Sequence, residues 1–159
     1  IPKISLNKGG IIVEKTLLLL KPDAVARGVC GEIIARFERR GLKPIGIKML
    51  QLSREQAVIH YNEHQGKAFF EELVGFITSG PLIAMVVCGE NAIKLSRVMM
   101  GATNPLDALA GTIRGDYATL MRSNIIHGSD GPESAEREIK NFFKEHELFE
   151  HHAVNKGGI

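Results

Sequence analysis

Several features that would assign the chain to a special protein class are scarce or missing. There is no tryptophan, and two cysteines among 159 residues exclude a disulfide-dense mini-protein. Cys30 and Cys88 both lie in apolar segments, and we expect free, buried thiols of a reducing compartment. The longest apolar runs, Leu17–Leu20 and Leu82–Cys88, fall far short of the roughly 18 residues that a membrane-spanning helix needs. We therefore expect no membrane partner.

Charge of one sign is also scarce. The 20 basic and 18 acidic residues leave a formal net charge of +2, and no block of five or six like charges occurs. This mild charge argues against nucleic acid as a partner. Apolar residues make up 44% and charged residues 24% of the chain. This composition excludes collagen and a disordered tail, and together with the length it is typical of one globular domain.

The sequence predicts one domain over residues 14–150, with an extension at 1–13 and a short tail at 151–159. The first 13 residues contain Lys3 and Lys8, no acidic residue and no apolar segment of a signal peptide. They fit either the stub of a removed basic transit sequence or a remnant of cloning. We expect a cytoplasmic protein, with an organelle as the alternative if a transit sequence was removed.

Apolar periodicity predicts that strands and helices alternate along the domain. Strands are predicted at 14–20, 42–52, 82–88 and 124–126, and helices at 31–40, 53–61, 69–77, 91–100 and 134–143. Ser53 and Gln56 form the pattern of a capping box. The alternation predicts an α/β (α+β) fold with a single sheet and helices on one face. The order matches the ferredoxin-like βαββαβ pattern if the helices after Ser53 are an insertion.

The segment 101–121 is predicted to be a long, irregular loop, because Gly101, Pro105, Gly111 and Gly115 interrupt it. A loop of about twenty residues inside a compact domain is uncommon and is usually functional. We therefore expect part of an active site in this loop.

The sequence has no GxxxxGK[ST] and no GxGxxG motif, so a phosphate site must be built from side chains. Lys21, Arg97 and Arg114 are cations that can bind phosphate oxygens, and Thr103 can donate a hydroxyl hydrogen bond. His127 stands at the end of a short apolar strand, where a neutral imidazole can act as a nucleophile or a base. Taken singly, each of these residues is more often structural or solvated.

Four motifs change that reading when they are taken together. They are LKPDA at 20–24, GATNP at 101–105, GTIRGD at 111–116 and NIIHGSD at 124–130. With these motifs the chain resembles the nucleoside diphosphate kinase family from about residue 14 to residue 143. The resemblance implies transfer of the γ-phosphoryl group of a nucleoside triphosphate to a nucleoside diphosphate, by a ping-pong mechanism through a phosphohistidine. It also implies Mg²⁺ as the cofactor, with no protein side chain as a metal ligand.

The resemblance assigns roles to particular residues. His127 matches the family's nucleophile, and Glu138 matches the acid that fixes the other imidazole nitrogen. Ser129, Tyr61 and Lys21 match the residues that support catalysis. The residues that match the nucleotide-binding site are Lys21, Phe69, Leu73, Arg97, Thr103, Arg114, Met121 and Asn124.

The chain departs from the family pattern in three places, one of which is the extra start at residues 1–13. Met121 stands where a small aliphatic residue is usual, although a thioether still packs on a base ring. Ala110 stands where many members have proline, which removes a rigid turn next to subunit contacts. The family forms hexamers or tetramers from a common dimer, so the resemblance implies a homo-oligomer of one of these two sizes.

Other interpretations compete with these assignments. Phe69 could be a core residue, Glu138 a solvated helix residue, and Tyr61 a surface residue at a helix end. His60, His64 and His146, with two further histidines at 151 and 152, suggest a metal site. The spacing of the last three matches no zinc motif, and no cysteine accompanies it. An inactive relative kept as a scaffold would have lost one of the matched residues, and none is lost.

Overall fold

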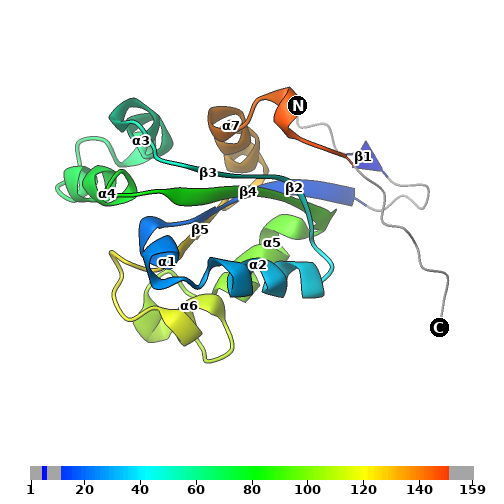
Figure 1. Ribbon diagram of the computed structural model, residues 1–159, viewed down its shortest axis with the longest axis horizontal. Coiled ribbons are helices and arrows are strands. Elements are labelled where there is room, and N and C mark those ends of the chain that lie inside the picture. The colour runs from blue at the N-terminus through cyan, green and yellow to red at the C-terminus, as the bar shows by residue number, and fades with distance from the viewer. Residues whose placement is uncertain (1–4, 7–11, 151–159) are drawn as a thin grey trace.

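The computed structural model describes residues 5–6 and 12–150 (Figure 1). The predicted tail at 151–159 and most of the predicted extension at 1–13 lie outside the described residues. The strands are β1 (Ser5–Leu6), β2 (Ile12–Leu20), β3 (Lys43–Leu50), β4 (Leu82–Glu90) and β5 (Ile126–Gly128). The α-helices are α1 (Pro22–Arg27), α2 (Cys30–Arg39), α3 (Arg54–His60), α4 (Phe70–Ile77), α5 (Ala92–Met100), α6 (Ile113–Tyr117) and α7 (Pro132–Phe142). Short 3₁₀ turns lie at Asn62–His64, Pro105–Asp107 and Glu145–Glu147.

The strands form one antiparallel sheet with β2 and β4 at its centre. β4 pairs with β2 on one side and with β3 on the other, so β3 is an edge strand. The second edge of β2 pairs with β1 near its start and with β5 near its end. The order β5-β2-β4-β3 with helical crossovers is the ferredoxin-like arrangement, which confirms the predicted fold class.

Helices cover both faces of the sheet, so the expectation of helices on one face only was wrong. Successive side chains of a strand point to opposite faces. Leu17 and Leu19 pack in a cluster with residues of α3, α4 and α7, whereas Leu18 and Leu20 pack with residues of α1, α2, α5 and α6. Figure 1 shows α3 and α7 on the opposite side of the sheet from α2, α5 and α6. The crossover helices lie on one face as expected, and the insertion after Ser53 and the last helix cover the second.

Local sequence explains most helix boundaries. Pro22 begins α1, and Gly28 ends it in the left-handed conformation with φ 69°. The predicted capping box is present at α3, where the Ser53 hydroxyl accepts a hydrogen bond from the Gln56 backbone N–H at 3.1 Å. The predicted loop at 101–121 is not structureless, because it contains a 3₁₀ turn and the short helix α6.

Both cysteines are free, as expected, with Cys30 buried and Cys88 half-buried. Burial raises the pKa of both thiols. Among the described residues, no helix is both long enough and apolar enough to span a membrane.

The register of β5 fixes which face of the sheet receives His127. The strand pairs antiparallel with β2, and His127 lies opposite Leu19. Residues that face each other across an antiparallel pair point to the same side of the sheet. His127 therefore points to the face that α3, α4 and α7 cover, and its neighbours come from these helices.

Candidate active site

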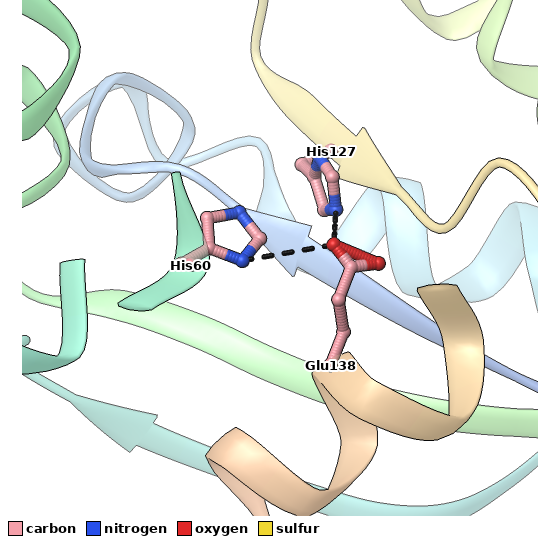
Figure 2. A group of neighbouring side chains, drawn as sticks. All are labelled: His60, His127 and Glu138. Atoms are coloured by element: carbon pink, nitrogen blue, oxygen red, sulfur yellow. Dashed lines mark hydrogen bonds and ion pairs between the residues drawn. The ribbon is translucent and has the colours of Figure 1, made fainter. Parts of the chain in front are cut away.

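A buried carboxylate holds the imidazole of His127. Figure 2 shows Glu138 reaching from α7 to β5, and its Oε2 lies 2.7 Å from His127 Nε2. The Glu138 side chain is only 7% exposed, so it is not a solvated helix residue. Burial raises the pKa of Glu138, but the hydrogen bond and the charge of His127, together with the Ser129 hydroxyl, outweigh burial and lower it. An ionised Glu138 accepts the Nε2–H of His127, which leaves Nδ1 as the ring nitrogen with a free lone pair.

His60 is a member of the site that the sequence did not reveal. Its side chain is 1% exposed, its Nδ1 lies 3.6 Å from Glu138 Oε2, and its ring meets the His127 ring edge to face at 4.6 Å (Figure 2). Burial lowers the pKa of His60 to about 3, and the charge of His127 adds to this effect. His60 is therefore neutral at physiological pH, and it leaves the charge of Glu138 available to His127. Only its position beside Tyr61 could have pointed to it.

Tight packing holds β5 against the rest of the sheet. A Cβ atom at Gly128 would lie 2.5 Å from the Met100 sulfur and 3.2 Å from the Leu18 side chain, so a larger residue there would displace the Met100 side chain. The Ser129 hydroxyl accepts a hydrogen bond from the Leu17 backbone N–H at 3.3 Å. These contacts fix the backbone on the C-terminal side of His127.

Two arginines surround the His127 backbone. Arg114 of α6 donates to three backbone carbonyls, those of Gly101, Asn124 and Ile126, at 3.0, 3.3 and 2.7 Å. Arg97 of α5 donates to the Gly128 carbonyl at 3.1 Å. Burial lowers the pKa of Arg114 to about 10, and the nearby charge of Arg97 adds to this effect. Arg114 therefore remains a cation at neutral pH on the N-terminal side of the histidine, and Arg97 contacts the backbone on the C-terminal side.

Lys21 and Asn124 form a second polar group at the end of β2. The buried Lys21 ammonium donates a hydrogen bond to the Asn124 side-chain oxygen, and the Asn124 amide donates to the Thr103 carbonyl at 2.9 Å. Burial lowers the pKa of Lys21 to about 8, with a smaller lowering by Arg114 and an opposing effect of Asp23. The predicted loop at 101–121 is thus tied to β2 through Asn124.

The remaining predicted residues lie on α3 and α4 and on the turn before β5. Tyr61 is 9% exposed, and burial raises its pKa to about 12. Phe69 is 46% exposed at the start of α4, so it is not a core residue. Leu73 lies one turn further along this helix and is half-buried. Met121 is 60% exposed on the turn before β5.

An ion pair brings the segment that carries Met121 next to α4. Arg122 Nη1 lies 3.7 Å from Glu72 Oε1 of this helix. The pair is exposed and adds little stability. It nevertheless shows that the turn carrying Met121 faces the helix that carries Phe69, with exposed apolar side chains on both sides.

Comparisons with known proteins agree with this arrangement. A family model described as nucleoside diphosphate kinase matches residues 14–148. The nucleoside diphosphate kinase of Carboxydothermus hydrogenoformans is 60% identical over 136 residues, which are 86% of this chain and 91% of the relative. The chain belongs to the nucleoside diphosphate kinase family. It is thus an enzyme of nucleotide phosphoryl transfer.

Further relatives of this kinase show how far the similarity extends. The nucleoside diphosphate kinase of Pelotomaculum thermopropionicum is 58% identical over 139 residues, 87% of this chain and 93% of the relative. The structure of a halophilic nucleoside diphosphate kinase from Halobacterium salinarum, in complex with CDP, has a TM-score of 0.87 and 47% sequence identity. The match covers 89% of this chain and 94% of that one.

In the described part of this kinase, one group of side chains brings three metal-ligating atoms together. It consists of His60, His127 and Glu138, whose ligand atoms lie within 4.8 Å of one another. Mg²⁺ prefers oxygen ligands in octahedral geometry, and two imidazole nitrogens do not supply them. The short hydrogen bond also occupies Nε2 of His127. These three side chains are therefore suited to fixing the proton on Nε2 of His127 beside the Glu138 charge, and they are not suited to binding Mg²⁺.

Proposed function

We propose that this chain transfers the γ-phosphoryl group of a nucleoside triphosphate to a nucleoside diphosphate through a phosphohistidine on Nδ1 of His127. One observation carries the proposal: Glu138 holds Nε2–H of His127 at 2.7 Å, and no hydrogen bond engages Nδ1 among the described residues. Three cations, Lys21, Arg97 and Arg114, lie around the same segment. A nucleophilic nitrogen among cations is suited to attack on a polyphosphate.

In the first half-reaction, the lone pair of His127 Nδ1 attacks the γ-phosphorus. The P–Nδ1 bond forms while the bond from the γ-phosphorus to the β,γ-bridging oxygen breaks, and the nucleoside diphosphate leaves with that electron pair. The imidazole ring becomes more positive in this step. Glu138 stabilises the developing charge through its buried hydrogen bond, because electrostatic interactions strengthen in a water-poor environment.

In the second half-reaction, a terminal β-phosphate oxygen of the acceptor attacks the phosphohistidine. The P–O bond forms, the P–Nδ1 bond breaks, and the electron pair returns to Nδ1. Donor and acceptor occupy the same site in turn, which is the ping-pong order. Phosphoryl transfer needs positioning and charge neutralisation more than covalent work by the protein, and the fixed β5 backbone supplies the positioning.

Arg97, Arg114, Lys21 and the Thr103 hydroxyl bind the phosphate oxygens in this proposal. A guanidinium group carries five N–H donors in a fixed fork. The bonds of Arg114 to backbone carbonyls therefore leave donors for phosphate, and these bonds set its orientation in advance. Binding energy is then not spent on ordering a flexible side chain.

Phe69, Leu73 and Met121 bind the base by apolar contact. The exposed ring of Phe69 and the exposed thioether of Met121 stand on two segments that Arg122 and Glu72 bring together. Stacking accepts every base, whereas buried donors select one. The CDP complex of the Halobacterium salinarum relative supports a nucleoside diphosphate as ligand. Lys21 and Asn124, which already bond each other, bind the ribose 3′-OH.

Mg²⁺ would be held mainly by the phosphate oxygens of a bound nucleotide. The residues around His127 are mostly cationic, and Glu138 is engaged with the histidine. The phosphate oxygens of the nucleotide are then the main ligands of the ion, with no ligand from a protein side chain. When bound, Mg²⁺ neutralises charge that develops on the phosphate oxygens.

We further propose a cytoplasmic homo-oligomer, a hexamer or a tetramer built from dimers. β3 is an edge strand of the sheet, and its Ile47 and Met49 side chains are more than half exposed. An exposed apolar edge strand is an aggregation hazard unless another chain covers it. A second copy of this chain at this edge would bury both side chains, and sedimentation analysis measures the resulting mass.

Labelling tests the proposed function. The protein is incubated with Mg²⁺ and ATP labelled on the γ-phosphate, freed of nucleotide, and then mixed with GDP. We expect an acid-labile, base-stable label that moves to GDP. His127→Asn should take up no label, and the matched control His64→Asn should label like the wild type. Failure of wild-type protein to take up label contradicts the proposal.

A further inference from the structure

The backbone of Ile125 has a conformation that isoleucine rarely adopts. Its φ is 71°, in the left-handed region, where a β-branched side chain is a genuine outlier. The side chain is fully buried in the core on the face of α2 and α5. Such conformations persist only where the surroundings impose them, and they concentrate at functional sites. Ile125 lies two residues before His127.

The segment at the end of β2 holds both backbone groups of Ile125. The Asp23 carboxylate accepts a hydrogen bond from the Ile125 N–H through Oδ2 at 3.0 Å. The Lys21 N–H donates to the Ile125 carbonyl at 2.9 Å. Asp23 Oδ1 is buried and has no hydrogen-bond partner among the described residues. The carboxylate therefore makes one directed contact, and its charge is not neutralised by a hydrogen bond at Oδ1.

The conformation of Ile125 fixes the direction in which Asn124 and Ile126, on either side of it, point toward Lys21 and Arg114. Asn124, directly before it, bonds the Lys21 ammonium, and its carbonyl accepts from Arg114. Ile126, directly after it, gives its carbonyl to the same arginine. A change in φ at Ile125 would separate Asn124 from this arrangement while β5 stays paired. The bond from Asp23 thus acts on the site through the backbone.

We propose that Asp23 is a positioning residue of the active site: it holds Ile125 at its positive φ, in the turn that the Ile126 N–H closes on the Asn124 carbonyl at 2.8 Å. Lys21 bonds the Asn124 side chain while Asp23 bonds the next residue, and from this placement we assign the Asp23 carboxylate as the counter-charge of the Lys21 ammonium. This inference rests on the proposed function, and it adds a residue to which no role in the site was assigned. Asp23 belongs to the LKPDA motif. The sequence marks it only by its place after Lys21 and Pro22.

The electrostatic part of the proposal concerns the buried Lys21. Burial lowers its pKa to about 8, Asp23 raises the pKa, and Arg114 lowers it. The other groups that face the ammonium are neutral or aromatic. They are the Asn124 amide, the Phe76 ring of α4 at 5.7 Å, and His60, which is neutral at physiological pH. Asp23 is thus the carboxylate that favours the charged form.

The sign of the expected pH effect follows from this arrangement. The protonated form of Lys21 binds phosphate, so activity falls as pH rises through its pKa. Removal of the Asp23 charge lowers this pKa further, because burial and Arg114 then act unopposed. The basic limb of kcat/KM, which reports groups of the free enzyme, should therefore move to lower pH.

Two substitutions of Asp23 separate its two tasks. Asp23→Asn keeps an oxygen that can accept the Ile125 N–H, but it removes the charge. Asp23→Ala removes both. Glu38→Gln is the control for the loss of one carboxylate, because Glu38 is exposed on α2, which packs on the opposite face of the sheet from Glu138. The measurements are kcat and kcat/KM from pH 5.5 to 9.5, with the thermal midpoint of each variant as a check on folding.

We expect Asp23→Asn to keep the kcat of the wild type within threefold below pH 6.5 and to move the basic limb of kcat/KM down by about one pH unit. Asp23→Ala should also lower kcat tenfold or more at every pH, and Glu38→Gln should change neither quantity. An unshifted basic limb in Asp23→Asn overturns the counter-charge role, as does a loss that is equal at all pH values. Wild-type kcat in Asp23→Ala overturns the positioning role. Wild-type protein that takes up no label from ATP defeats the proposed function instead, which is a different result.

Discussion

The charge of Glu138 should contribute to the rate of phosphoryl transfer without contributing to nucleotide binding. Its carboxylate accepts the His127 Nε2–H at 2.7 Å and is almost fully buried, and no nucleotide contact is proposed for it. Glu138→Gln keeps an oxygen that can accept this N–H, so the tautomer and the ring orientation should survive. A hydrogen bond to a charged group is worth about 1.5–3 kcal/mol, against about 0.5–1.5 kcal/mol for a neutral one. The difference of about 1–2 kcal/mol predicts a loss of roughly 5–30-fold in kcat with KM unchanged.

Rapid quenching is the suitable assay, because the chain has no tryptophan to report the reaction by fluorescence. The rate at which labelled phosphate appears on the enzyme in a single turnover isolates the first half-reaction. Glu136→Gln is the matched control, because Glu136 lies on the same helix and pairs only with Lys140 in the part of the chain that the structure describes. If Glu138→Gln keeps the wild-type phosphorylation rate, or if its whole defect lies in KM, the charge of Glu138 does not stabilise the transition state.

Three other predictions follow from the site and the core. Arg114→Lys should lower kcat/KM tenfold or more, since one ammonium cannot replace a fork that bonds three carbonyls and phosphate; wild-type steady-state kinetics would contradict this. A 3′-deoxynucleoside diphosphate should react roughly 5–150-fold more slowly, because it lacks the hydroxyl group that Lys21 and Asn124 bind through two hydrogen bonds worth about 0.5–1.5 kcal/mol each. The kcat/KM values for ADP, GDP and CDP should differ by no more than about 5–30-fold, or about 1–2 kcal/mol. Phe37→Ala should lower the free energy of unfolding by about 3–5 kcal/mol in a urea titration, because Phe37 is fully buried against the sheet; a loss below about 1 kcal/mol would show that the core collapses around the cavity.

The order of strands and helices was predictable because apolar patterning survives in every long element. Four predicted strands and five predicted helices have counterparts, and the capping box of α3 is present. The covering of both faces was missed, although the continuous run Leu17–Leu20 carries the signal. A strand without polar alternation is buried on both sides, and this needs helices on both faces.

The short elements β5 and α6 could not be placed from the sequence, because their positions depend on contacts between residues far apart in the chain. β5 runs over Ile126–Gly128 and not over 124–126, and Ile125, directly before it, has a φ of 71° that no strand pattern contains. α6 is only five residues long and lies in a glycine-rich segment, where its cap at Thr112 is the only local signal. Such elements are fixed by tertiary hydrogen bonds, here those of Asp23 and Arg114.

The candidate site residues were reached through the four motifs and not through local chemistry. The structure brings Lys21, Arg97, Arg114 and Asn124 into one bonded group around His127. Their roles toward a nucleotide stay proposals. His60 escaped because nothing in the sequence shows that the end of α3 meets α7.

The most direct test of phosphoryl transfer through His127 is to identify the ring nitrogen that carries the phosphoryl group. One portion of phosphoenzyme made from Mg²⁺ and labelled ATP is hydrolysed in alkali, and the product is compared with authentic Nδ1- and Nε2-phosphohistidine. A second portion is digested with a protease, and the labelled peptide is sequenced. Because Glu138 holds Nε2 of His127, we expect the hydrolysate to contain Nδ1-phosphohistidine alone. We expect the labelled peptide to be the one that contains His127. Nε2-phosphohistidine, or label on the peptide that contains His60, would contradict it.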